Sequence, residues 1–395
     1  MASNLSFLDV VGICDNVRLR RDESGLYDTA YNSEKLVPLH LSESPQSPVI
    51  GLLRPVIVEQ LKLENERSKQ LNIAETWSLR LEASEYTVSK KSHSGPSVSF
   101  CGWLDTPLKR TAIMKELCER WRDTELFPDV CGPKKWRAEM YPVYADPFGI
   151  HDHPSHGSDD ETQLNYVFEM ERSVCALFGV ITYGVHMNMY EEIVQKDGQK
   201  QLRIWVPTRA LTKPTQVCFF CRVDILYGLM SLFSFPGYLD NTVAGGLPSG
   251  MPIFECLVKE CMEEANIGPD IVRKYARAAG SISYFFRSVG FTSIVRSGCL
   301  FHNLERLKVG FNLRSSELPP LFPASVWIKQ CNRYVYDIVI PPDVDPTPFI
   351  PRPLDGEVES FEVCQTCILT SFFFFLMSSA RFTRPTLKTS SFWLV

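Results

Sequence analysis

The sequence lacks the features of several specialised classes of protein. Its 395 residues carry a net charge of −5, which does not indicate the concentrated basic surface of a nucleic-acid-binding protein. The amino terminus has neither the basic start nor the continuous apolar core of a secretory signal, and early acids at Asp9 and Asp15 argue against a mitochondrial presequence. Thirteen cysteines, an odd number, do not suggest a secreted disulfide framework. We therefore expect a cytoplasmic protein with reduced thiols and no nucleic-acid partner.

Membrane-spanning segments are also not expected. The apolar stretch 217–235 is long enough to span a bilayer, but it contains Arg222 and Asp224. Each charge would cost about 2.5–3.5 kcal/mol at the middle of a bilayer. A later phenylalanine run, 372–375, is too short to span. With 45% hydrophobic residues, the chain is expected to be globular, with room for two domains.

The most informative stretch is 245–267, in which a glycine-rich turn leads into a predicted helix. Three carboxylates, those of Glu260, Glu263 and Glu264, fall within a sector of about 100° on this helix. Clustered carboxylates repel one another unless they share a cation, and hard oxygen ligands suit Mg²⁺ or Mn²⁺. The pattern favours metal-assisted attack on a phosphate, with an ordinary acidic helix surface as the simpler alternative. The opposite side of the helix is apolar and predicts a core-facing stripe of Phe254, Leu257, Val258, Cys261 and Ala265.

This stretch resembles the Nudix box, G-x5-E-x7-R-E-U-x-E-E-x-G-U, in which U is an aliphatic residue. Gly245 opens the motif, the three glutamates occupy its metal-binding positions, and Ile267 closes it. The resemblance implies a metal held by these glutamates. Four positions differ from the motif, where glutamate, arginine, an aliphatic residue and glycine are replaced by Met251, Lys259, Cys261 and Asn266.

The substitutions at Met251 and Lys259 are coupled, because the family's glutamate and arginine at these positions pair and brace the loop against the helix. Glu255 lies four residues before Lys259, which predicts a substitute ion pair worth only a few tenths of a kcal/mol. Asn266 is a tolerable exchange for glycine, since asparagine adopts the left-handed conformation better than most residues.

The resemblance extends to the fungal and plant Nudix hydrolases that carry a thiamin-pyrophosphokinase-related N-terminal region. It implies hydrolysis of a diphosphate linkage in a small molecule, with damaged thiamin diphosphate or an oxidised nucleotide such as 8-oxo-dGDP as candidate substrates. The chain has no P-loop, so kinase activity is not expected. Segments that carry the resemblance include GLLRP (51–55), LDTPLKR (104–110), ERWRDTELFPDV (119–130), LDNTVAGG (239–246) and DGEVESFE (355–362).

Residues 1–178 are predicted to form a separate α+β N-terminal domain. Thr106 and Pro107 provide a helix start, with threonine as N-cap and proline at the first helical position. Segment 147–162 is polar and rich in turn residues, and its three histidines favour a solvated loop over a metal site. The predicted buried stripe of the helix is Leu108, Ile113, Leu117 and Trp121.

Residues 179–395 are expected to form the Nudix domain, an α/β/α sandwich with a mixed sheet. Segments 179–190 and 200–206 have the composition of strands and predict a hairpin through the Asp197-Gly198 turn. The box follows, and further strands are expected at 282–286 and 334–340.

Three blocks do not fit this pattern: 216–235, 289–331 and 363–395. They are rich in phenylalanine, cysteine and serine and lack amphipathic periodicity, so on a surface they would expose large apolar patches. We hypothesise that they are translated intron sequence, the alternative being a lineage-specific elaboration. The pairs Cys218-x2-Cys221 and Cys364-x2-Cys367 are spaced like zinc ligands, but they lie far apart in these blocks, and zinc is not expected.

The predicted activity is that of a Mg²⁺-dependent (or Mn²⁺-dependent) diphosphate hydrolase. The Gly245-Gly246 loop would approach the phosphates closely, which only glycine permits at low cost. Glu357 is the candidate for a late carboxylate acting as general base, although an ordinary exposed acid is the alternative. Two rival interpretations are a catalytically weak diphosphate-binding module and a mis-spliced product with little activity. The oligomeric state and the number of metals stay open.

Overall fold

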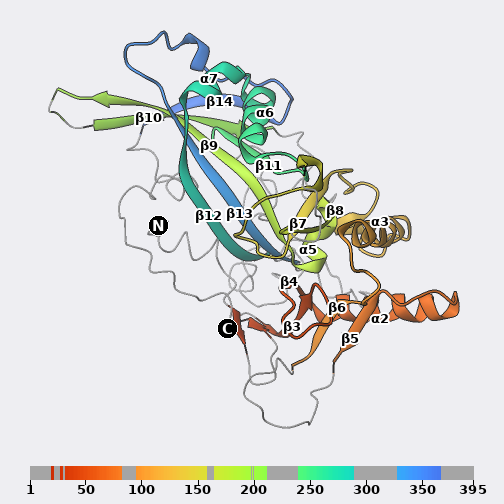
Figure 1. Cartoon of the computed structure of the whole chain (residues 1–395). Helices are drawn as coiled ribbons and strands as arrows, with labels where there is room; N and C mark the ends of the chain where they lie inside the picture. The colour runs from red at the N-terminus through yellow and green to blue at the C-terminus, as the bar shows by residue number, and fades with distance from the viewer. Residues whose placement is uncertain are drawn as a thin grey trace, which may run out of the picture.

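The computed structural model describes residues 19–21, 27–29, 32–81, 95–157, 164–196, 198, 200–210, 239–288 and 327–365. Within these residues the chain forms two six-stranded sheets, one two-stranded sheet and several helices. Figure 1 shows the long strands of the second sheet, with β7, β8 and α5 between them and the first sheet. The fold is α+β with mixed sheets, as predicted.

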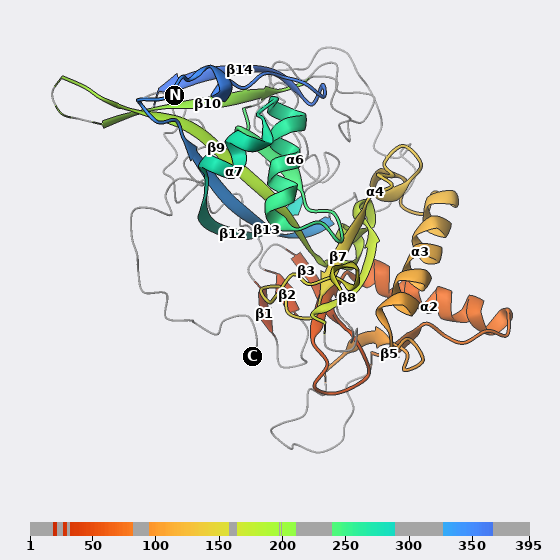
Figure 2. The same cartoon turned by 45° about the horizontal axis from the view of Figure 1, so that its top comes forward.

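The first sheet is formed by the N-terminal part of the chain. Strands β3 and β6 are parallel and the other pairs are antiparallel. The strand order is β1 (Leu19–Arg21), β2 (Tyr27–Thr29), β3 (Asn32–His40), β6 (Ser97–Phe100) and β5 (Trp77–Arg80), and β4 (Val49–Leu53) also pairs with β3. Figure 2 shows helices α2 (Pro55–Gln70) and α3 (Pro107–Asp123) side by side near β5.

Helix α3 begins where the sequence predicted. The hydroxyl of Thr106 accepts a hydrogen bond from the backbone nitrogen of Lys109 at 3.3 Å, and Pro107 is the first helical residue. The predicted buried stripe is correct for Leu117 and Trp121, and Ile113 is half-buried.

The prediction was wrong for Leu108, which is 76% exposed. Arg110, and not Leu108, is buried on the inner side of α3. Its guanidinium donates to the backbone carbonyls of Leu104 at 2.9 Å and Val167 at 3.0 Å, so the buried charge is hydrogen-bonded. Val167 is 57 residues away in the sequence, and helical periodicity gives no signal for such a partner.

A hairpin and two short helical turns follow. Strands β7 (Met140–Tyr144) and β8 (Tyr166–Glu171) pair antiparallel, and the chain continues through η3 (Arg172–Val174) and α5 (Cys175–Phe178). The short helices α4 (Pro128–Cys131) and η1 (Pro154–His156) lie before and within this part of the chain.

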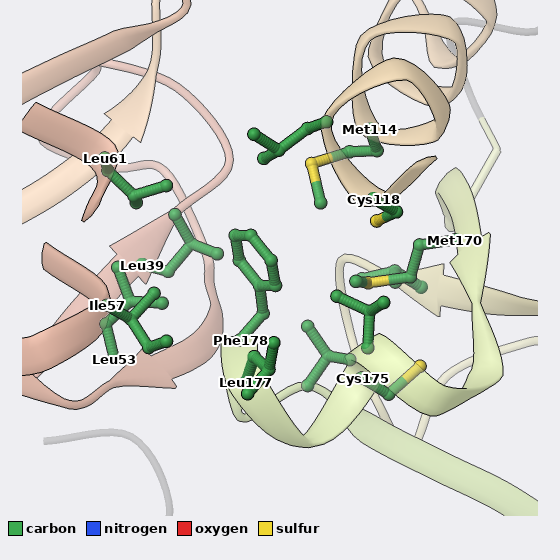
Figure 3. Close-up of a cluster of buried hydrophobic side chains, with 14 of the residues drawn as sticks. Leu39, Leu53, Ile57, Leu61, Met114, Cys118, Met170, Cys175, Leu177 and Phe178 are labelled. Carbon is green, nitrogen blue, oxygen red and sulfur yellow. The ribbon is translucent and has the colours of Figure 1, made fainter. Parts of the chain in front are cut away.

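Phe178 connects the two sides of the first hydrophobic cluster. Its ring lies 6.0 Å from that of Trp77 and 5.7 Å from that of Trp121, in stacked arrangements. Figure 3 shows Phe178 between side chains of the first sheet and α2 on one side and of α3 on the other. The N-terminal sheet and the helices thus share one core.

The second sheet contains the strand that leads into the box helix. Strands β9 and β13 are parallel, and the other pairs are antiparallel. The strand order is β12 (Ala276–Ser288), β13 (Trp327–Val339), β9 (Ile181–Val194), β10 (Lys200–Arg209) and β14 (Val358–Gln365), and β11 (Val243–Gly246) also pairs with β9. Helices α6 (Ile253–Ala265) and α7 (Pro269–Tyr275) lie beside this sheet in Figures 1 and 2, and η6 (Thr347–Phe349) precedes β14.

The predicted hairpin and later strands are present. β9 and β10 pair antiparallel, and Val194 and Lys200 are the last pair before the turn. Gly198, in this turn, has a φ of 81°, a left-handed conformation that glycine adopts at low cost. Residues 327–331 and 363–365, which the sequence placed in the discordant blocks, belong to β13 and β14 and pair in register.

The remainder of these blocks lies outside the described residues, as do the apolar stretch 217–235 and Cys218, Cys221 and Cys367. The intron hypothesis therefore stays a prediction. None of the helices in the described part of the chain is long and apolar enough to cross a membrane.

The two large hydrophobic clusters interleave around the predicted domain boundary. Val180 packs with the first cluster, whereas Tyr144 and Tyr166 pack with the second, which also contains the apolar side of α6. The division into residues 1–178 and 179–395 stays a prediction.

The two leucines of α3 give a matched test of its orientation. Leu117→Ala should lower the free energy of unfolding by about 2–5 kcal/mol, because Leu117 is 2% exposed and its loss leaves a cavity. Leu108→Ala should change it by less than about 0.5 kcal/mol. Urea unfolding of the two variants measures both values, and equal losses would contradict the orientation of the helix.

Candidate functional site

Helix α6 presents the box residues much as the sequence predicted. Leu257, Val258, Cys261 and Ala265 are buried, and Phe254 is half-buried with its ring 6.0 Å from that of Tyr336.

The helix ends at Asn266, which has a φ of 53° and a ψ of 36°. The backbone nitrogen of Asn266 donates to the carbonyl of Met262 at 3.1 Å, and that of Ile267 donates to Cys261 at 3.0 Å. The left-handed conformation expected of Asn266 is confirmed.

The three glutamates lie on one helix but have different surroundings. Glu264 is 5% exposed, and its Oε2 accepts a hydrogen bond from the backbone nitrogen of Ala244 at 2.9 Å. The side chain of Glu260 is 13% exposed, whereas that of Glu263 is 48% exposed. Glu264 therefore fastens α6 to β11, and Glu260 and Glu263 lie closer to solvent.

Lys259 lies between these two carboxylates. Its Nζ is 2.8 Å from Oε2 of Glu263 and 3.2 Å from Oε1 of Glu260. Burial works to lower the pKa of the ammonium, but the hydrogen bond to Glu263 and the charge of Glu260 outweigh it and hold the pKa above its usual value. The two carboxylates thus converge on one cationic position.

The predicted pair between Glu255 and Lys259 was wrong. Glu255 instead forms two hydrogen bonds of 2.7 Å with the guanidinium of Arg273 on α7. The planar fork of an arginine matches both oxygens of a carboxylate, which a lysine cannot do. Lys259 is consequently directed toward the two other glutamates.

Gly245 and Gly246 lie in strand β11 and not in a loop, which corrects the sequence prediction. A Cβ atom on Gly245 would overlap the side chain of Glu260, and one on Gly246 would overlap the hydroxyl of Tyr141. Glycine is therefore required here for close approach of α6 and β7 to the strand. The turn that follows depends on Gly250, which has a φ of 75°.

The histidine segment supports this turn. Nε2 of His156 is 2.9 Å from the backbone carbonyl of Gly250, and an added Cβ on Gly250 would lie 3.2 Å from the ring of His153. The loop 151–157 therefore packs directly against the turn at Gly250, between β11 and α6.

The prediction of a solvated loop was wrong for His151. Its Nε2 lies 2.9 Å from the hydroxyl of Tyr334, and its ring centroid lies 4.4 Å from that of Tyr144 and 4.5 Å from that of Tyr183. Burial lowers the pKa of His151 to about 4. The neutral imidazole is thus part of the packing between the loop and the second sheet.

Glu357 lies within electrostatic range of the box carboxylates. Burial is the main reason that the pKa of Glu260 lies above its usual value, and the charge of Glu357 raises it further, while Lys259 opposes the rise. Glu357 is half-buried and directly precedes β14. Its assignment as general base stays a prediction.

Sequence reasoning missed Tyr141, Glu139 and Arg172, which border the same strand. Nη1 of Arg172 is 2.7 Å from Oε2 of Glu139, and its guanidinium carbon is 5.2 Å from the ring centre of Tyr141. The same carbon would lie 3.4 Å from a Cβ on Gly246. These residues are distant from the box in the sequence, and no spacing or motif marks them.

The donor set fits a divalent cation in part. Glu260 and Glu263 offer hard oxygens that already surround one positive charge, while one oxygen of Glu264 is held by Ala244. Across the described ranges, no three His, Cys, Asp or Glu side chains are arranged to hold a metal ion. A metal at this place would therefore have to displace Lys259.

The half-buried His151 predicts a pH dependence of stability. The folded-state pKa of His151, about 4, lies below the ordinary value of about 6.5, so its contribution is complete above that value and is lost as the pH falls. His151→Gln, which cannot titrate, should reduce the loss of unfolding free energy between about pH 7.5 and about pH 5 by about 1–2 kcal/mol. Urea unfolding at both pH values measures this difference, and an unchanged pH dependence would show that His151 is not buried as a neutral group.

The chain is similar in sequence to several known proteins, although no family model matches it. An uncharacterized protein of Saccharomyces cerevisiae is 31% identical over 242 residues, covering 61% of this chain and 51% of that protein. The chloroplastic Nudix hydrolase 20 of Arabidopsis thaliana is 30% identical over 260 residues, covering 66% of this chain and 46% of its own. The chloroplastic Nudix hydrolase 24 of the same plant is 28% identical over 288 residues, which cover 71% of this chain and 55% of that protein.

The chain spans about half the length of these relatives. Among solved structures, a MutT/nudix family protein from Enterococcus faecalis is 10% identical, with 47% of this chain and 43% of that chain covered. An Ap4A hydrolase of C. elegans is 11% identical, with 46% of this chain and 79% of that chain covered. Their TM-scores, 0.23 and 0.21, are too low to carry an argument. The sequence similarities to the two plant enzymes support a relationship of this chain to the Nudix family.

Proposed function

We propose that this chain is a Nudix-type hydrolase that cleaves a diphosphate linkage with the help of Mg²⁺ or Mn²⁺. The observation that carries the proposal is the convergence of Glu260 and Glu263 on one cationic position beside Gly245. Carboxylates held this close around a positive charge are suited to a divalent ion that also contacts phosphate oxygens. The similarity to two Nudix hydrolases supports the same activity.

Each carboxylate has a distinct role in this proposal. Glu260 and Glu263 would hold the metal, and Glu264 would join them as the third carboxylate on the helix. A bound divalent cation lowers the pKa of an attacking water and neutralises the charge that develops on the phosphate. Glu264 also positions the helix through its bond to Ala244. Glu357, near Glu260, would accept the proton of the attacking water as general base.

The substrate is proposed to be damaged thiamin diphosphate or an oxidised nucleoside diphosphate such as 8-oxo-dGDP. Residues 1–178 would form a thiamin-pyrophosphokinase-related domain and residues 179–395 the hydrolase domain. The contacts of His156 with Gly250 and of Tyr141 with Gly246 support a role of the N-terminal part in shaping the site. We further propose that the protein acts in the cytoplasm on a small molecule.

A diphosphate-binding module without turnover is the second candidate. The pairing of Lys259 with Glu260 and Glu263 favours it, because an ammonium already neutralises the carboxylates that a metal would use. Hydrolysis and metal binding must therefore be measured separately.

The first measurement is phosphate release with Mg²⁺ from a panel that includes oxidised thiamin diphosphate and 8-oxo-dGDP. Glu263→Gln should lower kcat at least about 100-fold, since it removes a charged group from the reaction centre. Glu255→Gln is the matched control on the same helix, because Glu255 pairs with Arg273 away from the other glutamates, and it should retain activity. Equal activity of the two variants would overturn the assigned site.

The second measurement is Mn²⁺ binding followed by electron paramagnetic resonance. Lys259→Met should tighten Mn²⁺ binding about two- to fivefold, because it removes the ammonium that competes for the same two carboxylates. Arg273→Met, which removes a cation paired only with Glu255 among these acids, should leave the affinity unchanged. Unchanged or weaker Mn²⁺ binding in Lys259→Met would contradict competition at this position.

A further inference from the structure

A small cavity lies between helices α2 and α3, in the N-terminal part of the chain. Its volume is about 110 Å³, and its wall is formed by residues of α2, of α3 and of the segment that leads into β5. Figures 1 and 2 show α2 and α3 well apart from α6, so this cavity is separate from the box glutamates. An apolar cavity of about 150 Å³ holds one benzene molecule. The cavity between α2 and α3 therefore has the size for one small ring.

Much of the cavity wall is apolar. Trp77 and Leu117 are 1% and 2% exposed and form its inner part, and Ile113 is half-buried. Ile73 and Trp103 are 54% and 40% exposed, so they lie at its mouth and the cavity opens to solvent. Aromatic and aliphatic walls with a few polar groups are typical of sites that bind small organic molecules.

The indole of Trp77 has a hydrogen-bond donor without a partner. Its Nε1 is buried, and none of the described residues accepts a hydrogen bond from it. The backbone of Trp77 is fixed by Asn65, whose Oδ1 accepts from the Trp77 nitrogen at 3.1 Å and whose Nδ2 donates to the Trp77 carbonyl at 2.6 Å. A buried indole N–H usually finds an acceptor, and leaving it unpaired costs free energy. The missing partner must be an acceptor, because an indole nitrogen only donates.

A second unpaired donor belongs to the same cavity wall. Nε of Arg120 is buried and has no acceptor in the part of the chain that the structure describes. The other two nitrogens of this guanidinium are paired, with Nη2 at 2.7 Å from Oε2 of Glu64 and Nη1 at 3.1 Å from Oε1 of Glu116. Glu64 also accepts from Nε1 of Trp121 at 2.9 Å, which helps to hold Arg120 in place.

The charges of the wall favour an uncharged ligand. Two carboxylates and two guanidinium groups line the cavity, so their formal charges cancel: Glu64, Glu116, Arg67 and Arg120. An anion that reached the unpaired donors would also lie beside the carboxylates. A water molecule needs several polar partners and would leave the apolar wall uncovered. A carbonyl oxygen on a ring supplies the acceptor, and the ring itself covers the apolar wall.

We propose that the cavity between α2 and α3 is a binding site for a small, uncharged, planar ring that carries a carbonyl oxygen, a class that includes lactams and pyrimidinones. The carbonyl accepts a hydrogen bond from Nε1 of Trp77, with Nε of Arg120 as the second donor, and the ring lies against the apolar wall toward Trp103. This site is independent of the box glutamates and does not rest on the proposed hydrolase function.

The test is a titration of the full chain, labelled with ¹⁵N in its tryptophans, with 2-pyridone. The indole resonance that is missing in Trp77→Phe identifies Trp77. In the wild type this resonance should shift with a Kd on the order of 1 mM, which is typical of a ligand of this size. Benzene, a ring of similar size without an acceptor, should bind at least about fivefold more weakly, because it leaves the indole N–H unpaired.

Three variants test the position of the site, with affinities measured by saturation-transfer NMR. Trp77→Phe removes the donor and should weaken 2-pyridone binding at least about fivefold. Ile113→Phe adds volume to the cavity wall and should weaken it similarly. Leu108→Phe is the matched control on α3, because Leu108 is 76% exposed and lies outside the wall, and it should leave the affinity unchanged.

The proposal fails if the Trp77 resonance does not move at 2-pyridone concentrations well above 1 mM, a result that would leave water as the occupant of the cavity. Equal affinities for benzene and 2-pyridone would overturn the role of the indole donor. Equal affinities of Ile113→Phe and Leu108→Phe would place binding elsewhere. Thermal melts of the three variants establish that each is folded. Because no step uses a diphosphate or a metal, these outcomes are independent of the hydrolysis assays.

Discussion

The close packing of helix α6 against strand β11 is the constraint on which the candidate site depends. The side chain of Glu260 occupies the space that a Cβ on Gly245 would need, and Glu264 accepts a hydrogen bond from Ala244 one residue earlier. Together these contacts set the distance and the rotation of the helix relative to the strand. Glu263, one turn from Glu260, is then directed to the same point near solvent.

Charge pairing around α6 decides what this point can bind. Arg273 takes both oxygens of Glu255, so Lys259 is left to pair with Glu260 and Glu263. Ion pairs with this degree of exposure contribute little to stability, so exchanging the ammonium for another cation costs the fold little. The proposed replacement of Lys259 by a metal would therefore leave the apolar side of the helix undisturbed.

The second contribution to the site comes from residues far away in the sequence. His156 supports the box loop at Gly250, and Tyr141 approaches Gly246 so closely that no side chain fits there. Arg172 lies on the same side of the strand as Tyr141, and the parallel pairing of β9 with β13 adds Arg333. The box strand is thus bordered by side chains from several segments that lie far from it in the sequence.

Local features of this protein could be predicted from the sequence alone. The N-cap at Thr106, the left-handed residue Asn266, the hairpin near Gly198 and the apolar side of α6 each depend on residues only a few positions apart. Such features carry their signal in periodicity and capping, which act within one or two turns or within one hairpin.

Only the tertiary structure decided which of several equivalent side chains would find a partner. Helical periodicity could not show that Arg110 would be buried while Leu108 is exposed, because the carbonyl that binds Arg110 belongs to Val167. It placed Glu260, Glu263 and Glu264 in one sector, but the burial of Glu264 depends on Ala244 in a strand. The packing of His151 against Tyr334 joins segments far apart in the chain, and such a contact leaves no trace in the local sequence.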